Sequence, residues 1–222
     1  MRKPVENFAR DIGPADTAGR LDAPSFHKNK DGLVEDVSRL LSASRGDVLE
    51  VGSGTGQHAV TFAKALPEIT YWPSDPVDEH LASIDAWRSS SGLPNVKPAT
   101  RLDCCQAAWT LGDRDLAAAS LEAILAINVI HIAPWAVAEA IVGGASKYLK
   151  PGGLMIFYGP YKKNGQHNSD GNIAFDEALR ARNAAYGIRD LEDLITCATV
   201  NGLTFKSETE MPANNKLVVF VA

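Results

Sequence analysis

Cysteine is scarce in this sequence of 222 residues, and long hydrophobic runs are absent. The three cysteines are Cys104, Cys105 and Cys197, and an odd number with one adjacent pair excludes a disulfide framework. The adjacent pair also lacks the spacing of a zinc site, so we expect reduced thiols and no metal. Since no run of about 18 apolar residues occurs, no membrane span is expected. The N-terminus has no apolar secretory core, so the expected location is the cytoplasm.

Positive charge is also in short supply. The 22 lysines and arginines are outnumbered by 27 aspartates and glutamates, which gives a net charge of −5. This balance provides no general attraction to nucleic-acid phosphates. We therefore expect a small-molecule partner rather than a nucleic acid or a membrane. The length and the hydrophobic content of 45% suffice for one α/β domain with a substantial core.

The most informative stretch is residues 48–56, which read VLEVGSGTG. Residues of strand type run into three glycines at alternate positions, and a helical pattern begins at Gln57. A strand that turns through glycines into a helix directs backbone N–H groups and the positive end of the helix dipole to one point. In α/β sheets, a nucleotide-like cofactor binds at this point.

Strand and helix patterns alternate along the chain, which is typical of an α/β protein with a parallel sheet. The strands expected in this part are residues 47–51, 69–74, 96–102, 121–127 and 154–158. A short helical turn is expected at residues 113–120. Two further strands are expected at residues 203–209 and 216–221, and their short connection demands an antiparallel pair.

Residues 1–24 contain proline and glycine breaks and predict a flexible N-terminal arm, which is either a frayed end or a lid. Residues 25–222 are expected to form a single domain because no linker divides them. A helix should begin near Phe26 with Ser25 as its cap. The polar segment 159–172 is too long for an ordinary connection and is a candidate functional loop.

Two classes of cofactor compete for the glycine turn. A dinucleotide fold requires G-x-G-x-x-G, whose third glycine would fall at Gln57. Here Gly52, Gly54 and Gly56 form G-x-G-x-G instead. Glu50 would repel a pyrophosphate but suits a cofactor that carries an amino group. S-adenosylmethionine (SAM) has an ammonium and a sulfonium and no phosphate, so the turn favours SAM.

Two further carboxylates follow the second and third expected strands. Asp75 can accept hydrogen bonds from both ribose hydroxyls of a cofactor, although it could instead cap a helix that starts after it. Asp103 can accept a hydrogen bond from the adenine amine while the backbone N–H of Cys104 faces the ring. The alternative for Asp103 is an ordinary loop aspartate.

Taken with the terminal antiparallel pair, these residues resemble a class I SAM-dependent methyltransferase. More narrowly, the sequence is similar to the methyltransferase-like protein 26 family in the blocks HKNKDGLVEDV, LEVGSGTGQHAVTFAKALP, INVIHIAPW, FYGPYKKNGQH and EMPANN. The resemblance implies a Rossmann-like sandwich with a seven-stranded, mostly parallel sheet whose last strand is antiparallel. It does not supply a substrate.

The methyl acceptor should bind at the carboxyl ends of the fourth and fifth strands. Asn128 is expected near the methionine part of the cofactor. His131 is the candidate base, because a histidine can take a proton from a hydroxyl near neutral pH. Tyr161 is the second catalytic candidate, as a donor to a substrate oxygen. The candidate substrate-binding residues are Asn29, Trp135 and Asn214, and for each of these side chains a structural role is the alternative.

The predicted function is therefore transfer of a methyl group from SAM to a small molecule at oxygen, by a monomer or a homodimer. The block NVIH replaces the [N/D]PP[Y/F] block of many amino-directed methyltransferases, which disfavours adenine-type N-methylation. The first alternative is a SAM-binding regulatory or partner protein without catalysis. The second is a nicotinamide-dependent oxidoreductase, and both Gln57 and Glu50 weigh against it.

Overall fold

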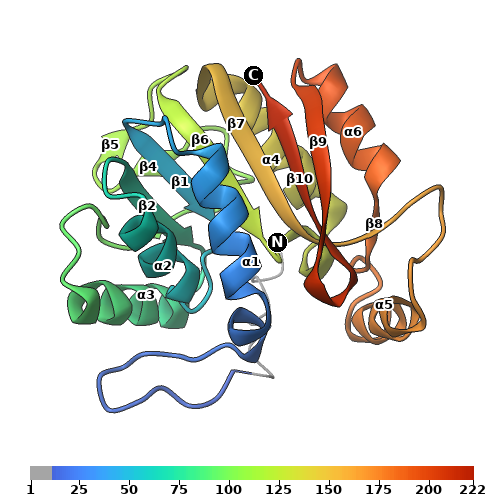
Figure 1. Cartoon of the computed structure of the whole chain (residues 1–222), viewed down its shortest axis with the longest axis horizontal. Coiled ribbons are helices and arrows are strands. Elements are labelled where there is room, and N and C mark those ends of the chain that lie inside the picture. The colour runs from blue at the N-terminus through green and yellow to red at the C-terminus, as the bar shows by residue number, and fades with distance from the viewer. Residues whose placement is uncertain (1–11) are drawn as a thin grey trace.

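The computed structural model describes residues 12–222 (Figure 1), so residues 1–11 of the predicted arm lie outside the described part. The helices are α1 (Pro24–Leu40), α2 (Gln57–Ala65), α3 (Asp78–Ser91), α4 (Trp135–Tyr148), α5 (Asp170–Arg182) and α6 (Leu191–Val200), with short 3-10 turns η2 (Ile130–Ile132) and η3 (Pro212–Asn214). Within residues 12–222, no helix combines the length and the apolar character needed to cross a bilayer.

The strands form one large sheet and one small hairpin. They are β1 (Asp47–Val51), β2 (Thr70–Asp75), β3 (Thr100–Arg101), β4 (Thr110–Leu111), β5 (Arg114–Asp115), β6 (Leu121–Ile127), β7 (Leu149–Lys162), β8 (Arg189–Asp190), β9 (Thr204–Met211) and β10 (Asn215–Val221). The large sheet has the order β3-β2-β1-β6-β7-β10-β9, and β8 pairs with β7 off this path. The last strand, β10, is antiparallel to both of its neighbours. The predicted mostly parallel sheet with an antiparallel last strand is confirmed, and β8 is an additional short strand.

The sheet is buried on both faces, which explains the apolar runs in its central strands. Successive side chains of a strand point to opposite faces, so Val48 packs in one core layer and Leu49 in the other. The Val48 layer contains residues of α1 and α2, whereas the Leu49 layer contains residues of α4 and α6. The fold is therefore a three-layer sandwich, with α1 in front of the sheet and α4 behind it in Figure 1.

Three sequence predictions about individual elements are wrong. The third strand shrinks from residues 96–102 to Thr100–Arg101, and Val96 forms only an isolated bridge with Tyr71. The expected helical turn at residues 113–120 does not form: its first residues belong to the hairpin of β4 and β5, and residues 116–120 are irregular. The first helix begins at Pro24, so Ser25 lies inside it and does not cap it.

The segment after the fifth strand also differs from its prediction. Strand β7 continues to Lys162, and α5 begins at Asp170, so half of the proposed loop at residues 159–172 is regular structure and the connection is residues 163–169. The end of β7 and the start of α5 therefore shorten the expected long loop from both sides.

The described part of the N-terminal arm packs against the domain. Leu21 is 3% exposed, its backbone N–H donates to Ser83 Oγ at 2.9 Å, and its carbonyl accepts from Trp87 Nε1 at 2.9 Å. Both partners belong to α3. Residues immediately before α1 are therefore bound to the neighbouring helix.

Candidate functional site

The candidate site lies where the parallel strands end, on the lower side of the sheet in Figure 1. The carboxyl ends of β1, β2, β6 and β7 meet at this edge because these strands are parallel neighbours. In open α/β sheets, ligands bind at this edge where the strand order reverses. Here the chain runs outward from β1 to β3 on one side and from β6 onward on the other.

The glycine turn has the backbone that only glycine adopts readily. Gly52, Gly54 and Gly56 have φ angles of +73°, +55° and +89°. A Cβ on Gly52 would lie 2.8 Å from Val129, and a Cβ on Gly56 would lie 2.8 Å from Ile84. A Cβ on Gly54, in contrast, would meet no atom within 4 Å. The outer glycines thus permit close packing, and the middle one leaves open space beside the turn.

Glu50 lies in β1, two residues before the turn, and is 1% exposed. Its Oε2 atom is buried and has no hydrogen-bond partner among the described residues. Burial raises the pKa of the Glu50 carboxyl to about 7, the side chains of Ser53 and Tyr71 oppose the rise through hydrogen bonding, and the negative charge of Asp75 adds to it. A buried carboxylate oxygen without a partner is costly, and a cationic ligand group would relieve that cost.

Asp75 lies at the end of β2, beside the glycine turn as predicted. Its Oδ2 accepts the Gly54 N–H at 3.0 Å, and its Oδ1 accepts the Val77 N–H at 3.0 Å. His80 Nδ1 lies 3.0 Å from the same Oδ1. Burial lowers the pKa of His80, the hydrogen bond and charge of Asp75 raise it, and the net shift is upward. Asp75 therefore holds the turn in place, and its remaining lone pairs are those available to a ribose.

Gln57 occupies the position of the third glycine in a dinucleotide fingerprint, and it binds the arm. Its Nε2 donates to Asp22 Oδ1 at 2.6 Å, while its Oε1 accepts from the Ala23 N–H at 2.7 Å and from Thr55 Oγ1 at 2.9 Å. The side chain is 2% exposed. It links the glycine turn directly to the residues that precede α1.

Asn128 and His131 follow β6 at the same edge. Asn128 has a φ of +58°, a left-handed conformation that asparagine tolerates better than most residues. A Cβ on Gly159, which lies in the buried part of β7, would lie 3.2 Å from His131 Nδ1 and 3.7 Å from Asn128 Oδ1. The structure thus brings these two side chains together over Gly159.

His131 does not have the basicity that the sequence led us to expect. It is 4% exposed and packs edge-on against Phe175 of α5, with ring centroids 5.7 Å apart. Burial lowers the pKa of His131 to about 3, and the positive charge of Arg189 contributes. The ring is therefore neutral at pH 7 and is a weak base, although it can still form hydrogen bonds.

Tyr161 does not reach the site. Its side chain is 1% exposed and lies in the core layer of α4 and α6, and its buried hydroxyl has no partner among the described residues. Burial raises the pKa of the Tyr161 phenol far above its usual range. The predicted role as a donor to the substrate is wrong for this arrangement. Side chains alternate between the two faces of β7, and Tyr161 points to the face that α4 and α6 cover.

Tyr158 lies on the opposite face of β7 and was missed by sequence reasoning. Its hydroxyl accepts from Asn215 Nδ2 at 3.2 Å, and Asn29 also lies beside it and influences its pKa, which burial raises overall. Asn29 is 6% exposed, and its Oδ1 lies 2.9 Å from His58 Nε2. The candidate substrate residue Asn29 thus belongs to a polar cluster built from α1, α2, β7 and β10.

Asp103 and Cys104 follow β3. The carboxylate of Asp103 accepts from the Cys105 N–H at 3.0 Å and from Gln106 Nε2 at 3.1 Å, so it already has local partners. The Cys104 side chain is buried in the core, and burial raises the pKa of its thiol far above its usual range. One ligand atom each from Asp103, Cys104 and Cys105 lies within 4.8 Å of the others. The adenine contact and the absence of a metal stay predictions.

Trp135 lies away from the position assigned to it, whereas Asn214 lies just before β10 at the edge of the sheet, and its role toward a substrate stays a prediction. Trp135 begins α4 and lines a groove between α4 and α6, so it does not form a wall beside His131. The Asn214 side chain is exposed, and it is the Asn214 carbonyl that accepts from Asn168 Nδ2 and Asn172 Nδ2, each at 3.2 Å. Asn214 therefore fixes the start of α5 at the edge of the sheet.

Residues 20–222 match a sequence family described as "Protein of unknown function (DUF938)". The chain belongs to this family. The match begins within the docked arm, at the residue before Leu21, so the family extends over the arm segment as well as the sandwich.

Solved structures with this fold include several methyltransferases. An O-methyltransferase family protein from Burkholderia thailandensis matches with a TM-score of 0.71 and 14% identity, over 86% of this chain and 55% of that one. An O-methyltransferase named as putative, from Nostoc punctiforme, matches with a TM-score of 0.72 and 12% identity, over 86% and 56%. The YcgJ protein from Bacillus subtilis gives 0.62 and 12%, over 84% and 97%. The chain spans about half the length of the first two, and these likenesses establish a Rossmann-like methyltransferase fold.

Proposed function

We propose that this chain is a SAM-dependent methyltransferase that transfers a methyl group to an oxygen of a small molecule. The observation that carries the proposal is the unpartnered, buried Oε2 of Glu50 beside a glycine turn with open space at Gly54. The methyltransferase fold and the printed names of the two O-methyltransferases support it.

The residues of the edge fit SAM better than a dinucleotide. The amino group of the methionine part would pair with Glu50, and no third glycine is needed because no pyrophosphate has to approach the helix. Asp75 would hold the ribose hydroxyls and Asp103 the adenine amine, with Asn128 beside the methionine part. When bound, SAM supplies an electrophilic methyl group, and the protein has to align the acceptor and exclude water.

The neutral state of His131 narrows the acceptor class. A ring with a pKa of about 3 accepts a hydrogen bond but removes a proton poorly from an aliphatic alcohol. Acceptors whose oxygen ionises readily, such as phenols and carboxylates, need little help from a base. We therefore propose a phenol or a carboxylate as the acceptor, oriented by His131 and the edge of Phe175.

Cofactor binding is the first test. Calorimetric titration of the full chain with SAM, S-adenosylhomocysteine and NAD should show binding of the first two only. Asp75→Asn should weaken S-adenosylhomocysteine binding about tenfold, which corresponds to one hydrogen bond to a charged group. Asp36→Asn is the matched control, because Asp36 pairs with Arg39 on α1, outside the glycine turn. Binding of NAD but not of S-adenosylhomocysteine would refute the proposal.

Turnover is the second test. Incubation with SAM and a panel of phenols, carboxylates and aliphatic alcohols, followed by mass spectrometry, should yield methylated phenols or carboxylates. If SAM binds and no member of the panel gains a methyl group, the non-catalytic SAM-binding alternative is favoured. If His131→Asn removes turnover while S-adenosylhomocysteine affinity is retained, the acceptor role of His131 is supported.

A further inference from the structure

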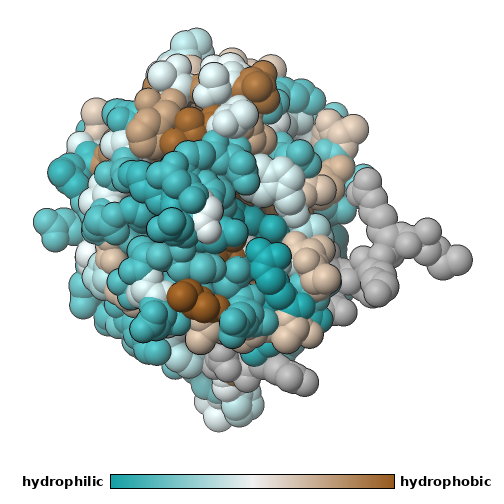
Figure 2. Space-filling view, turned by 90° about the vertical axis from the view of Figure 1, so that its right-hand side faces the viewer, coloured by the Kyte–Doolittle hydropathy of each residue, from teal (hydrophilic) through white to brown (hydrophobic). Residues whose placement is uncertain are grey.

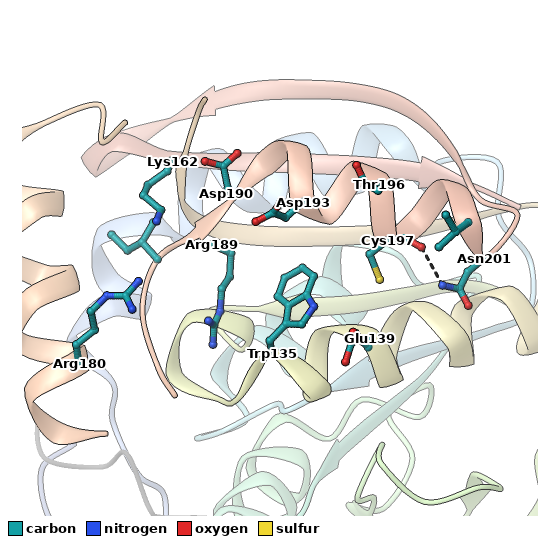
Figure 3. Close-up of a pocket in the computed structure, with 12 residues that line it drawn as sticks. Trp135, Glu139, Lys162, Arg180, Arg189, Asp190, Asp193, Thr196, Cys197 and Asn201 are labelled. Carbon is teal, nitrogen blue, oxygen red and sulfur yellow. Dashed lines mark hydrogen bonds between the residues drawn. The ribbon is translucent and has the colours of Figure 1, made fainter. Parts of the chain in front are cut away.

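A second hollow lies away from the glycine turn, on the side of the sheet that α4 and α6 cover. It has a volume of about 600 Å³ and runs between α4, β8 and α6. This size falls within the range of small-molecule sites. Figure 3 shows its lining side chains, which come from these elements and from the ends of β7 and α5. Trp135, predicted to bind the acceptor, lies in this groove instead, and none of the other lining residues was predicted to bind the cofactor or the acceptor.

One end of this groove gathers positive charge. Lys162, Arg180 and Arg189 come from β7, α5 and β8, and Figure 3 places all three at the same end. Burial and the nearby charge of Arg180 lower the pKa of Arg189, while Asp176 acts in the opposite direction. Like charges so close together attract an anion, because an anion between them removes their mutual repulsion.

The carboxylates of Glu139, Asp190 and Asp193 also line the groove, and in Figure 3 Glu139 lies on the far side of Trp135 from Arg180. At the cationic end, the neighbouring carboxylates of Asp176 and Asp190 have other partners. Asp176 is buried and pairs with Arg180 Nε at 3.2 Å, but its other oxygen accepts the Ile188 N–H at 2.6 Å. The carboxylate of Asp190 accepts backbone N–H groups of β8's neighbours, among them that of Gly165 at 2.5 Å. Lys162 forms no ion pair at 4.0 Å or less within residues 12–222, but its charge acts on Asp190 and contributes to the lowered pKa of that carboxyl.

The hydrogen-bonding groups of the two arginines are only partly used. Arg189 donates from Nε to the Ile130 carbonyl at 3.0 Å and from Nη2 to the carbonyls of Ala133 and Ala185, which leaves Nη1 for a ligand. Arg180 uses Nε alone, so both of its terminal nitrogens can form a fork with a carboxylate or phosphate.

A flat apolar surface adjoins the cationic end. The Trp135 ring lies 5.9 Å from the Arg189 guanidinium carbon, and in Figure 3 it stands in the middle of the groove. The face seen in Figure 2, from the side of α5 and α6, is mostly hydrophilic with small separate hydrophobic patches. A small polar ligand therefore suits this groove better than an apolar protein surface does.

We infer that this groove is a second binding site, for a small molecule that carries a carboxylate, sulfonate or phosphate on a planar apolar body. The anionic group would bind between Lys162 and Arg180, with Nη1 of Arg189 as a third donor, and the planar body would stack on Trp135. Because Arg189 also holds the carbonyls at both ends of the η2 turn, occupation of the groove would steady the turn that carries His131.

The test uses the full chain and 2-naphthoate, a carboxylate on a planar body, in calorimetric titration. A Kd on the order of 1 mM or below is expected for a ligand of this size. The uncharged analogue 2-naphthalenemethanol should bind at least about tenfold more weakly. Arg180→Met and Trp135→Leu should each weaken 2-naphthoate binding about tenfold. Arg189 is left unchanged, because its removal would release the η2 carbonyls.

Lys163→Met is the matched control, since Lys163 is adjacent to Lys162 in sequence but pairs with Glu208 at 2.7 Å, outside the groove. It should leave the 2-naphthoate affinity unchanged. Unchanged thermal unfolding and S-adenosylhomocysteine affinity would establish that each variant is folded. The inference is overturned if 2-naphthoate does not bind, if Arg180→Met and Trp135→Leu bind it as the parent does, or if S-adenosylhomocysteine displaces it. The last result would place the probe in the cofactor site.

Discussion

Replacement of Glu50 by glutamine should make the ligand-free protein more stable while it impairs the proposed function. The pKa of this carboxyl rises from 4.5 to about 7 on folding, so the folded protein retains its proton to a higher pH than the unfolded chain does. The contribution of Glu50 to stability is therefore greatest below pH 4.5, falls as the pH rises to about 7, and remains low above that.

The size of this effect follows from the same shift. The difference between 4.5 and about 7 corresponds to about 3 kcal/mol at pH 8. Glutamine has nearly the same shape and no charge, but its buried amide costs about 1–2 kcal/mol unless it finds partners. The buried hydroxyl of Tyr71, which lies beside Glu50 and lowers the pKa of its carboxyl, is a candidate acceptor for that amide. We expect a net gain of about 1–2 kcal/mol in the free energy of unfolding at pH 8.

Urea unfolding at pH 5 and pH 8 without ligand measures this difference. The advantage of Glu50→Gln should be about 1–2 kcal/mol at pH 8 and smaller at pH 5. Calorimetry with S-adenosylhomocysteine, which carries the same amino group, should show at least tenfold weaker binding by the variant. A variant that is less stable at pH 8 would refute the burial argument, and unchanged ligand affinity would refute the assignment of the amino group.

Three other changes test separate parts of the structure. Gly144→Ala should cost about 3 kcal/mol of unfolding free energy and lower the melting temperature by several degrees, because the added Cβ would lie 2.1 Å from Trp109. Gly143→Ala is the control: its Cβ would meet its first neighbour only at 4.0 Å, so it should be neutral or stabilising by up to about 1 kcal/mol. Gln57→Ala should cost about 2 kcal/mol and speed proteolytic cleavage within residues 12–23, and unchanged cleavage would contradict the docking of the arm. The contribution of His131 to stability should fall as the pH falls from 6.5 to about 3, because His131 stays unprotonated when folded and takes up a proton when unfolded, and this loss opposes the gain from Glu50. The urea midpoint of His131→Gln should therefore rise relative to that of the parent protein as the pH falls from 7 to 5.

The central strands could be predicted from the sequence because burial on both faces leaves a continuous apolar run. Residues 47–51 and 121–127 form strands with the predicted bounds. The third strand failed where Pro98 removes a backbone donor from the segment. The hairpin of β4 and β5 was missed although Gly112 and Asp113 form its two-residue turn, with Gly112 at a φ of +61°. The alanine-rich segment at residues 117–119 favoured a helical turn in the prediction and outweighed this turn signal.

The candidate site likewise contains residues that local spacing predicts and residues whose positions depend on contacts between distant segments. The glycine turn and Glu50 are contiguous, so their spacing predicts their geometry. Tyr161 was misplaced because the strand was ended at residue 158, although continued alternation would have put it on the core face with Phe157. The contact between Asn29 and Tyr158 joins α1 to β7, and no local spacing predicts a contact between residues so far apart in sequence. His131 is likewise buried by a distant segment, since Phe175 of α5 packs against its ring, and the residues next to His131 in sequence do not indicate this contact.

The position of β10 determines how this chain can fold during synthesis. Strand β10 lies between β7 and β9, so β7 remains an open edge until residues 215–221 are available. The unpaired strand β7 carries Met155 and Phe157, which are fully buried in the folded protein. An unpaired apolar edge is a template for association with other chains. The interval between the emergence of β7 and of β10 from the ribosome is therefore when this protein is most exposed to aggregation and most dependent on chaperones.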